Sequence, residues 1–226
     1  MSQSGFNGLT ERTFSFLADL QANNTKEWFD NNRARYDADW KAPSLDLISA
    51  LAEPMRDLTP SLKAEARLNG TLRRINRDVR FSKDKSPYNP RIHLIFWTGS
   101  HPNRSAAMHF VIHSDSIGYG AGVFGLTPAK LSVLRDRIMD PTDRAELLSA
   151  ISAASAVGCA FDPPDLKRLP QGYSCDADWE HLLRRKALVM RTLEPIAPPG
   201  WLATGDAVEQ IMALTRALMP LIRWLA

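Results

Sequence analysis

The stretch "RIHLIFWTGSHPNRSAAMHFVIHSDSIGYGAGVFG", residues 91–125, decides the fold class. It contains three short apolar segments, at 91–97, 106–113 and 116–125, separated by residues such as Gly, Pro, Asn and Ser. Short, partly alternating segments of this kind are typical of β-strands, and connections of hairpin length join antiparallel neighbours. With a fourth such segment at 71–81, they predict a mainly antiparallel sheet in the middle of the chain.

Helices are predicted on both sides of these segments in the sequence. Asn24 followed by Glu27 indicates a capping box that starts a helix reaching about Trp40. Thr127 before Pro128 indicates a second helix start. Further helices are expected at 43–58, 141–155, 176–190 and, as an amphipathic C-terminal helix, about 205–226. Helices, then strands, then helices predict an α+β fold, with residues 1–226 forming one domain whose helices pack around the sheet.

Length and composition favour an ordinary globular protein. The chain has 226 residues, of which 44% are hydrophobic, and a formal net charge of only +3. Its two cysteines fit no metal, redox or disulfide pattern, which favours a reducing compartment. No signal peptide and no apolar run of about 20 residues is recognisable, so we expect a cytoplasmic protein without a membrane span. The sequence does not identify a cofactor.

Positive charge is concentrated in one part of the chain. Residues 73–91 contain seven Arg or Lys and two Asp, while the remaining residues are slightly acidic in sum. If residues 74–81 form a strand, its side chains alternate between two faces. One face is polar and consists of Arg74, Asn76, Asp78 and Arg80. The other face is directed to the core but carries an arginine, and it consists of Ile75, Arg77, Val79 and Phe81.

We interpret this charged segment (residues 74–88) as a site for a phosphorylated or carboxylated ligand. Arginines offer two parallel hydrogen bonds to such anions, and the aspartates could orient them. Asp78 is the candidate catalytic residue, because it is the best placed proton acceptor if the protein is an enzyme. The predicted ligand-binding residues are Arg74, Arg77, Arg80, Lys83, Asp84, Lys85 and Tyr88.

Two other interpretations of the charged segment stay open. It could be a buried ion-pair network in a structural or protein-interaction module, whose apolar C-terminal helix serves a partner or a second copy of the chain. Alternatively, its cations could contact the phosphates of a nucleic acid, with Tyr88 or Trp97 stacking on a base. The compactness of the charged segment makes nucleic acid the weaker of these interpretations.

Several familiar motifs are absent or incomplete. Ser82 and Lys85 have the S-x-x-K spacing, but the companion motifs of that nucleophile pair are missing. His109 and His113 would lie roughly 13 Å apart on one strand, too far to share a metal, although His93 could join one of them across the sheet. No metal site is therefore predicted. "GAGVFG", residues 120–125, matches G-x-G-x-x-G outside a βαβ unit, so close backbone approach explains its glycines better than a dinucleotide does.

The charged segment also carries a resemblance. "RDVRFSKDKSPY", residues 77–88, resembles the R-D-x-R-F-S-K-D-K-x-P-Y signature of a family of conserved hypothetical proteins from bacteria and fungi, a domain of unknown function. The stretches 23–36, 126–138, 166–173 and 181–186 are similar to other parts of that family, so the resemblance covers about residues 10–190. It implies a single α+β domain with no established activity. The glycine-rich strand, here "GYGAGVFG", and "HPNRSAAMHF" before it depart from the family's pattern.

Overall fold

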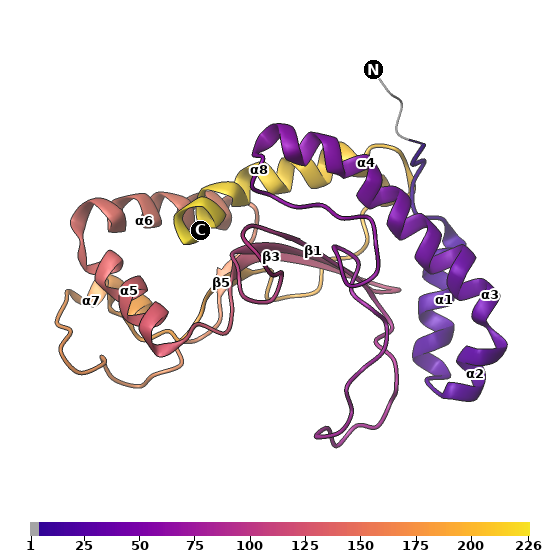
Figure 1. The fold of residues 1–226 in the computed structure, drawn as a ribbon, viewed down its shortest axis with the longest axis horizontal. Helices are drawn as coiled ribbons and strands as arrows, with labels where there is room; N and C mark the ends of the chain where they lie inside the picture. The colour runs from indigo at the N-terminus through magenta and orange to yellow at the C-terminus, as the bar shows by residue number, and fades with distance from the viewer. Residues whose placement is uncertain (1–4) are drawn as a thin grey trace. The chain divides into compact units, whose positions relative to one another are not determined.

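The computed structural model describes residues 5–226 and has an α+β fold, which confirms the predicted class. Helices precede and follow the strands along the chain (Figure 1). The N-terminal helices are α1 (Glu11–Ala22), α2 (Lys26–Asn31), α3 (Arg33–Arg35), the π-helix η1 (Tyr36–Lys41) and α4 (Ala42–Leu58). The later helices are α5 (Pro128–Met139), α6 (Pro141–Ala156), α7 (Ala177–Leu183), the 3₁₀ helix η2 (Gly200–Ala203) and α8 (Ala207–Leu225).

Five strands form one sheet in the order β1-β2-β3-β5-β4, and the predicted antiparallel arrangement is confirmed. The strands are β1 (Ile92–Trp97), β2 (Ala107–Ile112), β3 (Ile117–Val123), β4 (Ala160–Phe161) and β5 (Leu188–Arg191). Gly120 of β3 pairs with Arg191 of β5. A Cβ atom at Gly120 would lie 2.3 Å from the carbonyl oxygen of Met190, so the glycine is needed for close backbone approach.

Two predicted elements are wrong. Residues 71–81 are extended, but they make only isolated bridges, Leu72 to Leu94 and Asn76 to Tyr88, instead of a regular strand. The returning chain contains Pro87 and Pro90, which have no N–H to donate and therefore interrupt the ladder. The helix expected at 176–190 ends with α7 at Leu183, and residues 188–190 belong to β5. Its last residues, Leu, Val and Met, pair with β3 instead.

The described chain divides into two compact units. The first contains the chain up to Phe96 with His109–Gly118 and Pro195–Ala213, and the second contains Trp97–Met108, Tyr119–Glu194 and Leu214–Ala226. The core of the first unit includes a chain of aromatic contacts, from Trp40 to Tyr36 and from Tyr36 to Phe29. In the second unit the indole of Trp224 donates to the carbonyl oxygen of Asp143. The prediction of a single domain remains untested.

The C-terminal helix α8 has the amphipathic character that its sequence predicts. Seven of its large apolar side chains are buried within the chain itself: Ile211, Met212, Leu218, Met219, Leu221, Ile222 and Trp224. Self-association through this helix remains a prediction, but the apolar face on which the prediction depends is already covered. None of the described helices has the length and hydropathy required to cross a membrane.

Candidate functional site

The charged segment belongs to an arm (residues 71–91) in which two extended stretches of chain run side by side and meet in a loop (Figure 1). The N–H of Arg73 donates to the carbonyl oxygen of His93, and the N–H of Asn89 donates to that of Ile75. Nearer the loop, the N–H of Arg77 donates to the carbonyl oxygen of Pro87. The arm therefore holds its shape by sparse backbone pairing, and its side chains must provide the remaining order.

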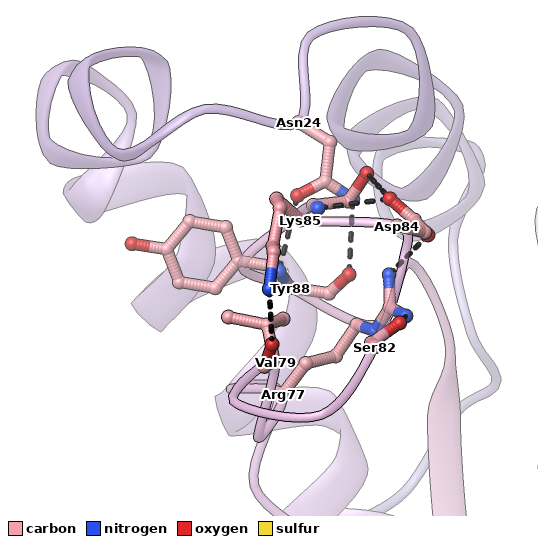
Figure 2. A network of polar contacts seen from close by, with 8 residues as sticks. Asn24, Arg77, Val79, Ser82, Asp84, Lys85 and Tyr88 are labelled. Atoms are coloured by element: carbon pink, nitrogen blue, oxygen red, sulfur yellow. Dashed lines mark hydrogen bonds and ion pairs between the residues drawn. The ribbon is translucent and has the colours of Figure 1, made fainter.

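Side chains provide this order at the arm tip (residues 77–86), as Figure 2 shows. Asp84 accepts hydrogen bonds from the hydroxyl and the N–H of Ser86, at 2.6 and 2.9 Å, and from the guanidinium of Arg77. The bonds from Ser86, followed by that from Arg77, hold the pKa of the Asp84 carboxyl far below its usual range. The Lys85 ammonium donates to the carbonyl oxygen of Val79 at 3.0 Å, which fastens the two sides of the loop together.

Asp78 and Arg80 form a second pair on the arm tip. The Arg80 Nε and Nη2 atoms lie 2.9 and 2.7 Å from the two carboxylate oxygens of Asp78. These hydrogen bonds, with one from the Arg80 backbone, lower the pKa of Asp78. A carboxylate with a lowered pKa is a weak base, so the geometry suits an ion pair better than proton abstraction. The catalytic assignment of Asp78 remains a prediction.

Asn24 joins the arm to the N-terminal helices (Figure 2). Its side-chain amide donates to the carbonyl oxygen of Tyr88 at 2.9 Å, and its oxygen accepts from the N–H of Tyr88 at 3.1 Å. The predicted capping role of Asn24 is therefore wrong, because the N-cap of α2 is Thr25, whose hydroxyl accepts from the N–H of Trp28. The Tyr88 ring stacks on Phe29 with ring centroids 4.2 Å apart.

A polar cavity of about 180 Å³ lies where the arm meets β1. We call it the arginine pocket, and its lining residues come from both stretches of the arm and the start of β1: Arg73, Arg74, Asn76, Asn89, Arg91 and His93. The backbone pairing of Arg73 with His93 brings the two stretches together at this level. The Trp40 indole, from η1, donates to the carbonyl oxygen of Arg91 and so supports the returning stretch. The pocket is thus built from residues far apart in sequence but held by defined contacts.

The three arginines of this pocket have no carboxylate partner. Within residues 5–226, no ion pair involves the guanidinium of Arg73, Arg74 or Arg91. Burial, followed by the charge of Arg74, lowers the pKa of Arg73. Burial, followed by the charge of Arg77, lowers the pKa of Arg91. The pocket therefore gathers three arginines without an ion-paired carboxylate, and two of them, Arg73 and Arg91, are partly desolvated. The charge of Arg74, which is exposed, also acts on the nearby carboxylate of Asp78.

A second cavity shows the contrasting, self-neutralised arrangement. It has a volume of about 330 Å³ and is lined by Glu11, Arg12, Ser15, Arg35 and Asp39. Here the Arg12 guanidinium lies 3.1 Å from the carboxylate of Asp39, and that of Arg35 lies 2.8 Å from Asp19. Because these cations have their own counterions, this cavity offers less attraction to an external anion than the arginine pocket does.

His93 contributes an imidazole to the arginine pocket and contacts a second histidine. Its Nε2 atom lies 3.0 Å from Nδ1 of His109, so the two histidines meet across the sheet, one of the arrangements that the sequence left open. Burial lowers the pKa of His93 to about 3 and that of His109 to about 4, and the nearby cations Arg73 and Arg91 act in the same direction. Both imidazoles are therefore neutral at pH 7, and a ring N–H of one donates a hydrogen bond to the unprotonated ring nitrogen of the other.

The predicted site residues divide between two places. Arg74 lines the pocket, whereas Arg77, Arg80 and Asp84 engage in ion pairs at the arm tip and Tyr88 is buried against Phe29. Lys83 is exposed, and Lys85 is bound to backbone. Two separate ion pairs form at the arm tip, and three of their four side chains are exposed while Arg77 is half-buried. These pairs are therefore not the buried network that the sequence left open as an alternative.

Sequence reasoning missed most of the pocket. Arg73, Asn89, Arg91 and His93 were not assigned to a site, although the local excess of cations between Arg73 and Arg91 was visible. The pairing of the two stretches of the arm, which brings these residues together, was not visible. Tyr88 and Trp97, the proposed base-stacking residues, are only 5% and 3% exposed, so neither ring is free to stack on a nucleic acid base.

Comparison with known proteins gives a family and no individual relative. A family model described as "Conserved hypothetical protein (DUF2461)" matches residues 12–224, a longer stretch than the resemblance of residues 10–190 implies. No curated protein matches the chain, and no solved structure does. Within residues 5–226, no group of three or more His, Cys, Asp or Glu side chains could hold a metal ion.

Proposed function

The chain belongs to the DUF2461 family of conserved hypothetical proteins, and from this premise we propose that it binds a phosphorylated or carboxylated ligand in the arginine pocket. The observation that carries the proposal is the convergence of Arg73, Arg74 and Arg91 on one polar cavity without a carboxylate. Arginine forks bind phosphate and carboxylate oxygens through paired, charge-assisted hydrogen bonds. The proposal concerns binding, and no reaction is assigned to the site.

The electrostatic cost of gathering these arginines supports this proposal. Gathering like charges in a partly desolvated cavity is unfavourable, and the lowered pKa values of Arg73 and Arg91 reflect that cost. An anion that enters the pocket relieves the repulsion and supplies hydrogen-bond acceptors to the guanidinium groups. Asn76 and Asn89 add carboxamide groups, which can donate to the same anion. These residues are arranged for an anionic partner from outside the chain.

A thermal-shift experiment with matched variants tests the proposal. We expect phosphate or a small carboxylate to raise the melting temperature of the wild type and not that of Arg73→Gln, because that substitution removes a pocket cation. Arg80→Gln is the matched control, since Arg80 pairs with Asp78 at the arm tip and should leave the shift intact. A shift that disappears in Arg80→Gln and persists in Arg73→Gln would place the ligand at the tip and contradict the proposal.

A structural function of the charged segment is the second candidate, and a specific observation favours it. Arg77, Asp84 and Lys85 each bind another part of the arm tip, and Asp78 binds Arg80. Exposed pairs of this kind contribute little to global stability. Their effect is local, since they fix the conformation of a loop that has sparse backbone pairing. The charged segment would then serve the pocket by shaping the arm rather than by contacting the ligand.

A further inference from the structure

We infer that the ligand of the arginine pocket is a phosphate monoester, recognised by its doubly ionised phosphate group. This inference rests on the proposed function, namely that the pocket binds an anion, and it selects one class among the anions. Three features of the pocket lead to it: its charge, its volume and the constancy of its charge with pH.

The charge of the pocket matches a dianion. Arg73, Arg74 and Arg91 bring three positive charges, while His93 is neutral at pH 7. A carboxylate has one negative charge and two acceptor oxygens, so it would leave most of this charge unneutralised. A phosphate monoester carries nearly two negative charges at pH 7 and has three terminal oxygens, which gives each guanidinium an acceptor. A phosphodiester keeps only one negative charge and two terminal oxygens.

The volume of the pocket limits what can enter. At about 180 Å³ it is smaller than the roughly 300–1,000 Å³ of cavities that enclose whole drug-sized ligands. It therefore suits a single charged head group, with the remainder of the ligand outside. Arg74 and Asn76 are exposed, so the pocket is open to solvent on their side. A monoester needs one such exit for its single substituent, whereas a diester needs room for two.

The charge of the pocket is constant over the range in which a phosphate monoester titrates. The arginines stay protonated in this range. The pKa values of His93, about 3, and of His109, about 4, lie below this pH range. Burial, followed by the charge of Arg91, also lowers the pKa of His113, whereas the charge of Asp115 raises it. The second pKa of a phosphate monoester is near 6. The pH dependence of binding between pH 8 and 5 therefore reports the ionisation of the ligand.

Calorimetric titration with methyl phosphate and sulfate tests the inference. Sulfate remains a dianion at both pH 8 and pH 5, so it corrects for any proton uptake by the histidines on binding. We expect the affinity of methyl phosphate, relative to that of sulfate, to fall about tenfold from pH 8 to pH 5, because only about a tenth of the ester is still a dianion at pH 5. Dimethyl phosphate and acetate should bind more weakly than methyl phosphate at pH 8.

The outcomes separate this inference from the proposed function. If methyl phosphate and sulfate bind but their relative affinity does not change with pH, the pocket accepts the singly charged ester and the inference is wrong. Acetate binding as tightly as methyl phosphate at pH 8 would also overturn it. If none of the four anions binds, the proposed function itself fails. Repeating the titration with Arg91→Gln, which should weaken methyl phosphate more than Arg80→Gln does, shows whether any binding is in the pocket.

Discussion

The arginines of the arm differ from one another in their counterions, and the proposed roles follow from this difference. Arg77 and Arg80 each have an aspartate within hydrogen-bond distance, so their charge is used within the arm tip. Arg73 and Arg91 have no such partner within residues 5–226, and their pKa values are lowered. The charge of an arginine with an internal carboxylate is partly neutralised, whereas that of an arginine without one remains available to a ligand. The presence or absence of a paired carboxylate, more than sequence position, therefore separates the proposed binding arginines from those of the arm tip.

We expect the His93–His109 pair to make the stability of the fold depend on pH. Both pKa values, about 3 and about 4, lie below the ordinary value of 6.5, so the unfolded chain binds more protons than the folded one in between. Stability is then fully present above pH 6.5 and is lost as the pH falls towards 4. We expect a loss on the order of 2 kcal/mol per histidine between pH 6.5 and 4.5. Urea unfolding at the two pH values measures this loss.

His93→Gln should unfold with a smaller pH dependence than the wild type, because it removes one of the two groups that gain a proton on unfolding. The matched control is His101→Gln, since His101 is an exposed loop residue outside the pair. If the His93→Gln variant lost as much stability as the wild type over this range, the histidine pair would not be the origin of the pH dependence.

At the scale of elements, local patterns predicted the strands and helices whose backbones pair regularly. The three strands predicted within residues 91–125 are present as β1, β2 and β3, and α5 starts after Thr127 at Pro128, as predicted. The errors occur where a distant segment competes for a local group. Asn24 has the sequence of a cap, but its amide binds the backbone of Tyr88, 64 residues away. The exposed side of the arm followed the predicted alternation, yet Phe81, expected to face the core, is 95% exposed.

The same competition explains why only one of the predicted ligand-binding residues lines the arginine pocket. Arg74 was a predicted ligand-binding residue, but the pocket depends on which residues of the returning stretch lie opposite it. The register between the two stretches of the arm depends on two prolines and on isolated bridges. No short-range sequence pattern predicts this register. The excess of cations therefore led to the proposal of an anionic ligand, whereas the choice of the proposed binding residues required the fold.

The link between Asn24 and Tyr88 is an element-scale device whose removal should loosen the arm. Asn24→Ala leaves the N–H and the carbonyl oxygen of Tyr88 without their partners, at a cost of about 1–3 kcal/mol. We expect faster amide hydrogen exchange in residues 86–91 and a lower melting temperature. Asn23→Ala is the matched control, because the Asn23 amide bonds only locally, to the carbonyl oxygen of Asp19 in α1. Equal exchange in both variants would show that the link does not hold the arm.

At the scale of the whole molecule, the boundary between the two compact units falls mostly within regular elements. It lies between residues 96 and 97 within β1, 108 and 109 within β2, 118 and 119 within β3, and 213 and 214 within α8, whereas the crossing between Glu194 and Pro195 lies in a loop. Separate domains are ordinarily joined by exposed segments rich in Gly, Pro or polar residues. A strand or helix that continues from one unit into the other differs from such an exposed linker. The single domain expected from the sequence remains a prediction.

A single domain should unfold in one cooperative transition, and this can be measured with one probe in each unit. Helix α4 belongs to the first unit and α6 to the second, and both contain fully buried leucines, Leu51 and Leu147. We expect peptides from the two helices to lose protection at the same urea concentration in pulse-labelling hydrogen exchange, because three strands and α8 each contribute residues to both units. Two separate midpoints would instead establish two domains.

In that case the arginine pocket should remain with the first unit, because all of its residues lie there. Methyl phosphate would then raise the unfolding midpoint of α4 and leave that of α6 unchanged.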